Sequence, residues 1–233
     1  MSRAPWRVAL IACLFVGCDD GTLRAFEAFV PAHGGAAGTG SNAEAGGGSG
    51  GATPGEPVAG AGGSGVSSPL LIDDFEDGDA RAKEPLGWWY PINDETGTQG
   101  FGIEPVSRGT ASVYALQTHG SGFRDWGAAV GVNLVGDATV LSAVGYESLC
   151  FSARIDAGTS TSIQAHLLRQ GAESHFSQEV SLSESWSRYC LPLADFVQPD
   201  GTPLVPSDII ALQFFFPPQS PFALWLDDVE LQP

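Results

Sequence analysis

The chain has 233 residues, of which 27 are aspartate or glutamate and 10 are lysine or arginine, so its formal net charge at pH 7 is −17. This charge excludes the dense cationic surface that nucleic-acid phosphates require, and it makes an anionic membrane surface a poor electrostatic partner. Neutral ligands, or hard cations such as calcium, are compatible with it.

The first 17 residues have the pattern of an export signal. Arg3 and Arg7 precede an apolar run, Val8–Gly17, which has the length of a signal-peptide core and is too short to cross a bilayer as a helix. The sequence Leu14-Phe15-Val16-Gly17-Cys18 at its end resembles a bacterial lipobox. We therefore predict an exported lipoprotein of the bacterial cell envelope, periplasmic or surface-exposed, with its lipid on Cys18. The alternative is an ordinary secretory signal followed by an unrelated cysteine.

A low-complexity segment follows the signal. From Pro31 to Ser68 the chain is mainly glycine, alanine and serine, and it lacks the apolar side chains that would offset the entropy lost on folding. We therefore predict a flexible tether over residues 18–68 and one folded domain over residues 69–233. The mildly apolar segment Leu23–Val30 has no assignment.

The sequence beyond Pro69 predicts an all-β domain. Short apolar runs recur about every ten to fifteen residues, separated by glycine, proline, asparagine and aspartate, a pattern typical of an antiparallel sandwich. Helical periodicity is almost absent. The expected strands are Leu71–Phe75, Gly87–Pro91, Ala115–Thr118, Ala128–Leu134, Glu147–Ile155, Ser162–Leu168, Phe176–Leu182, Ser187–Leu193, Ile209–Phe216 and Ala223–Leu231.

Alternation along two of these strands bears on the cysteines. Because side chains alternate across a strand, Leu149 and Phe151 face one way and Cys150 faces the other. Cys190 has the same outward position in its own strand. If the two strands are neighbours, the thiols meet on the outside of one sheet, and an exported domain is in an oxidising compartment. We predict a Cys150–Cys190 disulfide worth roughly 2–4 kcal/mol; the alternative is two unrelated cysteines.

Three segments resemble the jelly-roll carbohydrate-binding modules. Leu71–Asp79 followed by Gly87–Tyr90 resembles the start of these modules, and Phe222–Leu231 resembles their closing strand. Trp186–Phe196 resembles their segment of a tryptophan, a strand and then the sequence Pro-Leu/Phe-x-x-Phe. In order and spacing the segments are most similar to the β-glucan-binding modules of family eleven and to galactose-binding-like domains. The resemblance implies a jelly roll in which the strands of Cys150 and Cys190 are adjacent.

The same resemblance implies a structural calcium ion where the first and last strands meet. Asp227 shares its parity with Val229 and Leu231, so we expect it to point inward, where a carboxylate needs a partner. The expected calcium ligands are Asp74, Glu76 and Asp227, together with backbone carbonyls. The alternative is a solvated acidic turn in which Asp227 is hydrogen-bonded to the backbone.

The resemblance also implies a sugar-binding site on the concave outer face of one sheet. That sheet would contain the strands Ala128–Leu134, Ser162–Leu168, Phe176–Leu182 and Ile209–Phe216. The candidate ligand-binding residues are Tyr90, Gln164, His166, His175, Gln213 and Phe215. The alternatives are that Phe214–Phe216 pack in the core and at the sheet edge and that the histidines are ordinary surface residues. Trp126, Trp186 and Trp225 are assigned to the core.

The sequence contains no motif for nucleophilic, zinc-dependent or nucleotide-dependent catalysis. Its many carboxylates include no pair that the sequence singles out for glycoside hydrolysis. We therefore predict non-catalytic binding of a polysaccharide or oligosaccharide, such as a β-glucan, by a membrane-tethered lipoprotein. The alternative is a structural or protein-interaction module of the cell envelope that binds no sugar.

Overall fold

The computed structural model describes residues 68–233, apart from 84–85, 109–111, 135–139 and 173. The predicted signal peptide, the lipidation site Cys18 and the tether up to residue 67 lie outside the described residues. Within the described part, no helix has the length and the apolar character needed to cross a membrane.

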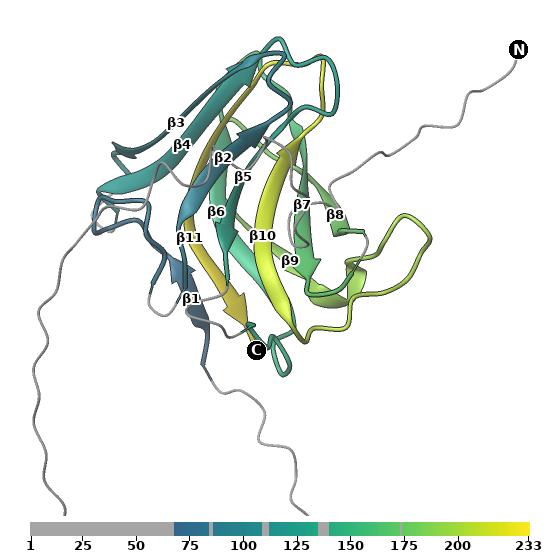
Figure 1. The fold of residues 1–233 in the computed structure, drawn as a ribbon. Helices are drawn as coiled ribbons and strands as arrows, with labels where there is room; N and C mark the ends of the chain where they lie inside the picture. The colour runs from purple at the N-terminus through teal and green to yellow at the C-terminus, as the bar shows by residue number, and fades with distance from the viewer. Residues whose placement is uncertain (1–67, 84–85, 109–111, 135–139, 173) are drawn as a thin grey trace, which may run out of the picture. The chain divides into compact units, whose positions relative to one another are not determined.

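The described strands form two antiparallel sheets that pack face to face, so the predicted sandwich is confirmed (Figure 1). The six-stranded sheet has the order β3-β4-β11-β6-β9, and β1 also pairs with β11. The five-stranded sheet has the order β2-β5-β10-β7-β8. The strands are β1 Leu70–Asp73, β2 Trp89–Asn93, β3 Thr98–Pro105, β4 Tyr114–Ser121, β5 Ala128–Asn133, β6 Ser148–Ile155, β7 Ser162–Arg169, β8 Phe176–Ser181, β9 Ser187–Pro192, β10 Ile209–Phe216 and β11 Phe222–Gln232; the short 3-10 helix η4, Leu193–Asp195, follows β9.

One strand, β3, was not among the strands predicted from the sequence. Its sequence contains two glycines and ends in a proline, residues that weaken the pattern of a strand. The structure shows why glycine is needed, because a Cβ atom on Gly100 would lie 2.4 Å from Cε1 of His119 on the neighbouring strand β4. The glycine therefore makes room for a cross-strand side chain.

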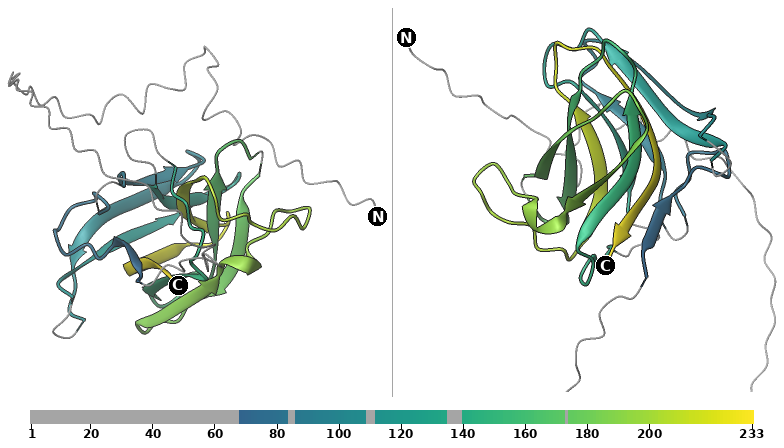
Figure 2. Two further views of the ribbon diagram at one scale, coloured as in Figure 1. Left: turned by 90° about the horizontal axis from the view of Figure 1, so that it is seen from below. Right: turned by 180° about the vertical axis from the view of Figure 1, so that it is seen from behind.

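The first and last strands lie side by side, as the resemblance to jelly-roll modules implied. Leu70 of β1 is opposite Leu231 of β11, and the two strands run antiparallel. In Figure 2 β1 lies beside the C-terminal part of β11, the middle strand of the six-stranded sheet. The pairing joins the two ends of the domain, so the fold is closed by residues far apart in the sequence.

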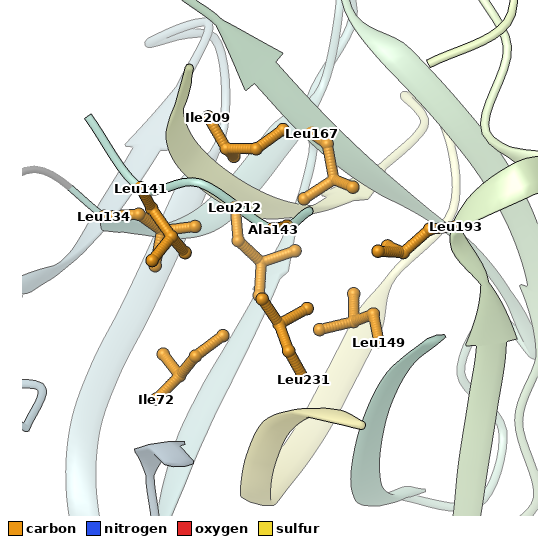
Figure 3. Close-up of a pocket in the computed structure, with 10 residues that line it drawn as sticks. All are labelled: Ile72, Leu134, Leu141, Ala143, Leu149, Leu167, Leu193, Ile209, Leu212 and Leu231. Atoms are coloured by element: carbon orange, nitrogen blue, oxygen red, sulfur yellow. The ribbon is translucent and has the colours of Figure 1, made fainter. Parts of the chain in front are cut away.

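The core lies between the two sheets and follows the expected alternation. Phe151, Phe214 and Leu226 point into it, and each is fully buried. A cavity of about 10 Å³ remains within it (Figure 3), and its lining is wholly aliphatic. Its lining residues are Ile72, Leu134, Leu141, Ala143, Leu149, Leu167, Leu193, Ile209, Leu212 and Leu231. A space so small and without polar partners is a packing defect rather than a ligand site.

The predicted disulfide is confirmed. Cys150 on β6 lies directly opposite Cys190 on β9, and their sulfurs are 2.06 Å apart. The neighbouring residues Leu149 and Phe151 are in the core, so the cystine lies on the outer side of the six-stranded sheet. It covalently links the edge strand β9 to its neighbour β6.

Candidate ligand-binding face

Three of the predicted ligand-binding residues lie in one row across the outer face of the five-stranded sheet. Tyr90 on β2 is opposite Gly131 on β5, and Gly131 is opposite Gln213 on β10. Gln213 is in turn opposite His166 on β7. Trp89 beside Tyr90, and the chain neighbours of Gly131, Gln213 and His166 on both sides, belong to the core, so the row faces outward.

The other three predicted residues lie around this row. Phe215 and Gln164 are opposite each other on β10 and β7, two residues along from the row and therefore on the same face. The rings of Phe215 and His166 are 5.1 Å apart between centroids, with an interplanar angle of 15°. His175, just before β8, places its ring 5.1 Å from that of His166. We call these residues together the polar–aromatic face: Tyr90, Gln164, His166, His175, Gln213 and Phe215.

A glycine allows the polar groups of the row to meet. A Cβ atom on Gly131 would lie 2.8 Å from Cγ of Gln213 and 3.2 Å from Cζ of Tyr90. Because glycine leaves this space open, Nε2 of Gln213 reaches the Tyr90 hydroxyl and donates to it at 3.4 Å. Burial raises the pKa of Tyr90, so its hydroxyl stays protonated near neutral pH. An amide and a phenol are thus held together in the row.

The histidines on this face are neutral. His166 is only 8% exposed, and burial, with a smaller contribution from His175, lowers its pKa to about 3. Burial also lowers the pKa of His175. Nε2 of His166 is 3.0 Å from Oε1 of Gln164, which fixes the orientation of the imidazole. Imidazole, amide and phenol groups supply both donors and acceptors without charge, as the hydroxyl groups of a neutral ligand require.

The prediction that three tryptophans belong to the core is wrong. Trp126 is only partly buried, and it lies next to Phe215 with 6.3 Å between ring centroids and 19° between planes. Trp186 and Trp225 are also partly exposed, on the outer side of the six-stranded sheet, where the Arg154 guanidinium lies 5.8 Å and 4.7 Å from their rings. Trp225 lies between the buried Leu224 and Leu226, so alternation along β11 places it outward. Trp126 and Trp186 lie just before β5 and β9, where the alternation of a strand does not apply.

Sequence reasoning also left out Trp88. This residue is 49% exposed and precedes Tyr90 by two positions, at the edge of the sheet where β2 begins. The doublet Trp88-Trp89 was a usable signal, because alternation sends one ring inward and the other outward. Trp89 is the inward one, at 3% exposure.

The predicted calcium ligands each have a partner from the protein itself. The Lys83 ammonium is 2.7 Å from Oδ1 of Asp74, and the backbone N–H of Val113 donates to Glu76 at 2.9 Å. Among the described residues no three His, Cys, Asp or Glu side chains gather as a metal site. This geometry does not fit a calcium ion on Asp74, Glu76 and Asp227, although calcium binding itself stays an untested prediction.

Asp227 shows why the expected arrangement does not form. The pairing register of β11 with β6 shifts between Asp227 and Glu230, and Asp228 has a positive φ of 48°. This bulge reverses the alternation, so Asp227 is opposite Ser152 on the outer side rather than pointing inward as predicted. Asp227 is nonetheless fully buried, because Arg108 and Ser112 cover it.

Arg108 supplies the positive charge at this position. Its Nη1 lies 2.8 Å from Oδ2 of Asp227 and 2.6 Å from Oδ2 of Asp228, and its Nη2 donates to Ser152 at 2.6 Å. Ser112 also donates to Asp227 at 2.7 Å. Desolvation raises the pKa of Asp227 even so, which shows how costly the charge would be without the guanidinium.

Comparison with known proteins is informative at the level of structure. No protein-family model and no curated protein sequence matches the chain. The family 11 carbohydrate-binding module of a cellulosomal cellulase of Clostridium thermocellum has a similar structure, with a TM-score of 0.52 and 15% identity over 72% of this chain and 95% of the module. The family 11 module of the same organism in complex with a β-1,3-1,4-mixed-linked tetrasaccharide gives 0.52 and 16% over 70% and 95%. A family 30 carbohydrate-binding module gives 0.52 and 15% over 70% and 87%. The described domain therefore has the jelly-roll fold of these carbohydrate-binding modules.

Proposed function

We propose that the domain binds a neutral polysaccharide or oligosaccharide, without chemistry of its own, through the polar–aromatic face. The observation that carries this proposal is the row Tyr90–Gly131–Gln213–His166, with the Phe215 ring beside it. Sugars present hydroxyl groups at the ring edge and C–H groups on the ring face. Neutral donors and acceptors next to aromatic rings complement both kinds of group.

Similar structures support this assignment. One solved structure of the same fold is a module in complex with a β-1,3-1,4-mixed-linked tetrasaccharide. We propose a β-glucan-like ligand for the present chain as well. None of the six residues of the polar–aromatic face carries a positive charge that would select an acidic sugar. The five strands of this sheet contain a single carboxylate, Glu179, which accepts a hydrogen bond from Ser162.

The presence of a single carboxylate on the strands of this sheet argues against hydrolysis. Glycosidases use a pair of carboxyl groups on either side of the scissile bond. The strands of this sheet supply Glu179 but no second acid opposite it, since its neighbour across the ladder is Gln164. Binding without turnover is therefore the activity we propose.

The anchoring that we propose is a lipid on Cys18, with residues 18–68 as the tether between the lipid and the domain. Palmitate labelling of the cells should mark the protein and should be lost in Cys18→Ala. Labelling that survives this substitution, or secretion of the whole chain into the medium, would contradict the anchor without affecting the binding proposal.

Affinity electrophoresis tests the binding proposal. The exported chain carrying Cys18→Ala would be run in native gels containing mixed-linked β-glucan, xyloglucan or dextran. We expect retardation by at least one neutral polymer and loss of that retardation in Gln213→Ala with His166→Ala. If none of a broad set of glycans retards the Cys18→Ala chain with its polar–aromatic face intact, the proposal fails. Capture of a defined envelope protein would then favour the structural module.

A further inference from the structure

Trp126 lies in a turn whose backbone is fixed on both sides of the indole. The turn joins β4 to β5, and the carboxylate of Asp94, from the connection between β2 and β3, reaches it. Oδ2 of Asp94 accepts the backbone N–H groups of Asp125 and Gly127, each at 2.9 Å. The N–H of Asp94 itself donates to the carbonyl of Gly127 at 3.0 Å. The residues before and after Trp126 are thus held by one side chain and its own backbone.

The Asp94 carboxylate is a permanent anchor. Partial desolvation opposes its ionisation, but hydrogen bonds from Thr96, Gly127 and Asp125 prevail and lower the pKa of Asp94 to about 2. Thr96 contributes both its backbone N–H at 3.0 Å and its hydroxyl at 2.6 Å. The carboxylate is therefore ionised at neutral and mildly acidic pH.

The turn is also fixed at its two ends. Phe123 is 2% exposed and packs on Phe222 with 6.0 Å between ring centroids, and its carbonyl accepts the N–H of Gln219 at 3.1 Å. Gly127 has a φ of +108°, and a Cβ atom there would lie 2.2 Å from the carbonyl oxygen of Phe216. Only glycine permits this approach, which brings the turn against the end of β10.

This fixed turn places the indole beside the polar–aromatic face. Trp126 lies next to Phe215 at 6.3 Å, and Phe215 lies next to His166 at 5.1 Å, with the planes of each pair within 20° of parallel. Three rings thus run in series from the turn to the centre of the face. A ring held by a rigid backbone loses little conformational freedom on binding, which favours affinity.

We propose that Trp126 contacts the ligand, with Asp94 as its positioning residue. Trp126 would be the aromatic residue at the edge of the polar–aromatic face where β5 begins and β10 ends. The occupant is a pyranose ring whose C–H face packs against the indole. This inference rests on the proposed function and adds a residue to it that the sequence had assigned to the core.

Glycan binding and the indole N–H resonances of the Cys18→Ala chain together test the inference. Trp126→Ala should weaken binding to the retarding polymer about tenfold, and Trp126→Phe should weaken it less. In the parent chain the Trp126 indole N–H, assigned from its absence in Trp126→Phe, should shift when an oligosaccharide of that polymer is added. Trp225→Ala, which removes an indole from the other sheet, is the matched control and should bind like the parent chain.

Asp94→Ala tests the positioning role. It should move the amide resonances of Asp125 and Gly127 and weaken binding, while Asp94→Asn should retain part of the affinity because it keeps an acceptor. If the parent chain binds and Trp126→Ala binds equally well, or if the Trp126 indole resonance does not move, this inference is overturned and the proposed function stands. If the parent chain binds no glycan, both are overturned. Should Trp126→Ala fail to fold, the indole shift and Trp126→Phe decide.

Discussion

The outer faces of the two sheets use similar residue types in opposite ways. On the six-stranded sheet the tryptophans lie against arginines, and the arginines pair with acids, as in Arg154 with Asp156 and Arg188 with Glu230. On the five-stranded sheet the aromatic rings lie beside neutral amide, phenol and imidazole groups. Charges that satisfy one another stabilise a fold, whereas neutral polar groups beside rings suit an exchangeable ligand. We therefore attribute a stabilising role to one face and propose recognition for the other.

The largest expected effect concerns Arg108. Arg108→Ala leaves the fully buried Asp227 without its ion pair, and loss of one partner of a buried pair costs about 3–5 kcal/mol. Urea unfolding should show this loss in the free energy of unfolding, while the glycan affinity of the folded protein stays unchanged. Arg188→Ala, on the same face but more exposed, is the control and should cost far less. Equal costs for the two variants would break the assignment of Arg108 as the key cation.

Removal of the disulfide comes next. Cys150→Ala with Cys190→Ala should lower the free energy of unfolding by about 2–4 kcal/mol, because the unfolded chain regains the freedom that the cross-link denied it. Calorimetry would measure the loss, and glycan retardation should be unaffected because the cystine lies on the other sheet. Weakened binding at temperatures where the variant is folded would contradict the division between the two faces.

A smaller effect is expected for the phenol of the row. Tyr90→Phe keeps the ring over Gly131 but removes the hydroxyl that meets Gln213, so we expect a loss of about 1 kcal/mol in binding, roughly fivefold in affinity. Isothermal titration with the retarding oligosaccharide would measure it. Tyr189→Phe is the matched control, since that hydroxyl serves Ser183 near the other sheet. Equal losses in both variants would count against the row as the binding element.

The pH dependence of stability gives a comparable but opposed pair of effects. Burial lowers the pKa of His166 from 6.5 to about 3 on folding. Its contribution to the free energy of unfolding is therefore fully present above pH 6.5 and is lost as the pH falls toward 3, because the unfolded chain takes up the proton first. Relative to His166→Gln, the wild type should lose about 1 kcal/mol between pH 7 and 5.5. Burial raises the pKa of Asp73 to about 6, so its contribution is present below pH 3.8 and is lost as the pH rises through 6. A difference between wild type and His166→Gln that does not vary with pH would show that the imidazole is not buried as described.

The smallest expected effect is that of calcium. Because Asp227 and Asp228 both pair with Arg108, and Asp74 pairs with Lys83, EDTA should leave the melting temperature of the wild type unchanged. Differential scanning calorimetry with EDTA and with calcium chloride measures this directly. A clear rise with calcium would instead support the calcium prediction made from the sequence.

Much of the fold could be predicted because alternation within strands is a local property. The parity of Cys150 and Cys190, and of Gln213 and Phe215, followed from their immediate neighbours and was confirmed. Gathering the six candidate residues on one face also needed the order of the strands, which the resemblance to jelly-roll modules supplied. Parity and order together were sufficient for this part of the site.

The errors have two sources, a change of parity within one strand and contacts between distant segments. The bulge at Asp228 reversed the side on which Asp227 lies, and the switch of buried positions from Leu224 and Leu226 to Val229 and Leu231 was an unused signal for it. The fully buried acid at the start of the domain is Asp73, which accepts the indole N–H of Trp89 at 2.8 Å, whereas the sequence analysis had singled out its neighbour Asp74 as a calcium ligand. Trp126 was misassigned because its place depends on Asp94, which is distant in the sequence.

The pairing of β1 with β11 determines how the domain would respond to force. Any pull transmitted through the preceding chain enters the described domain at β1, a strand of four residues whose pairing contains an irregularity. A ladder so short should yield before the longer ones around it, so β1 would detach first. The strands β2, β5, β10, β7 and β8 belong to the other sheet, so the polar–aromatic face would keep its structure, and the proposed ligand, while β1 detaches.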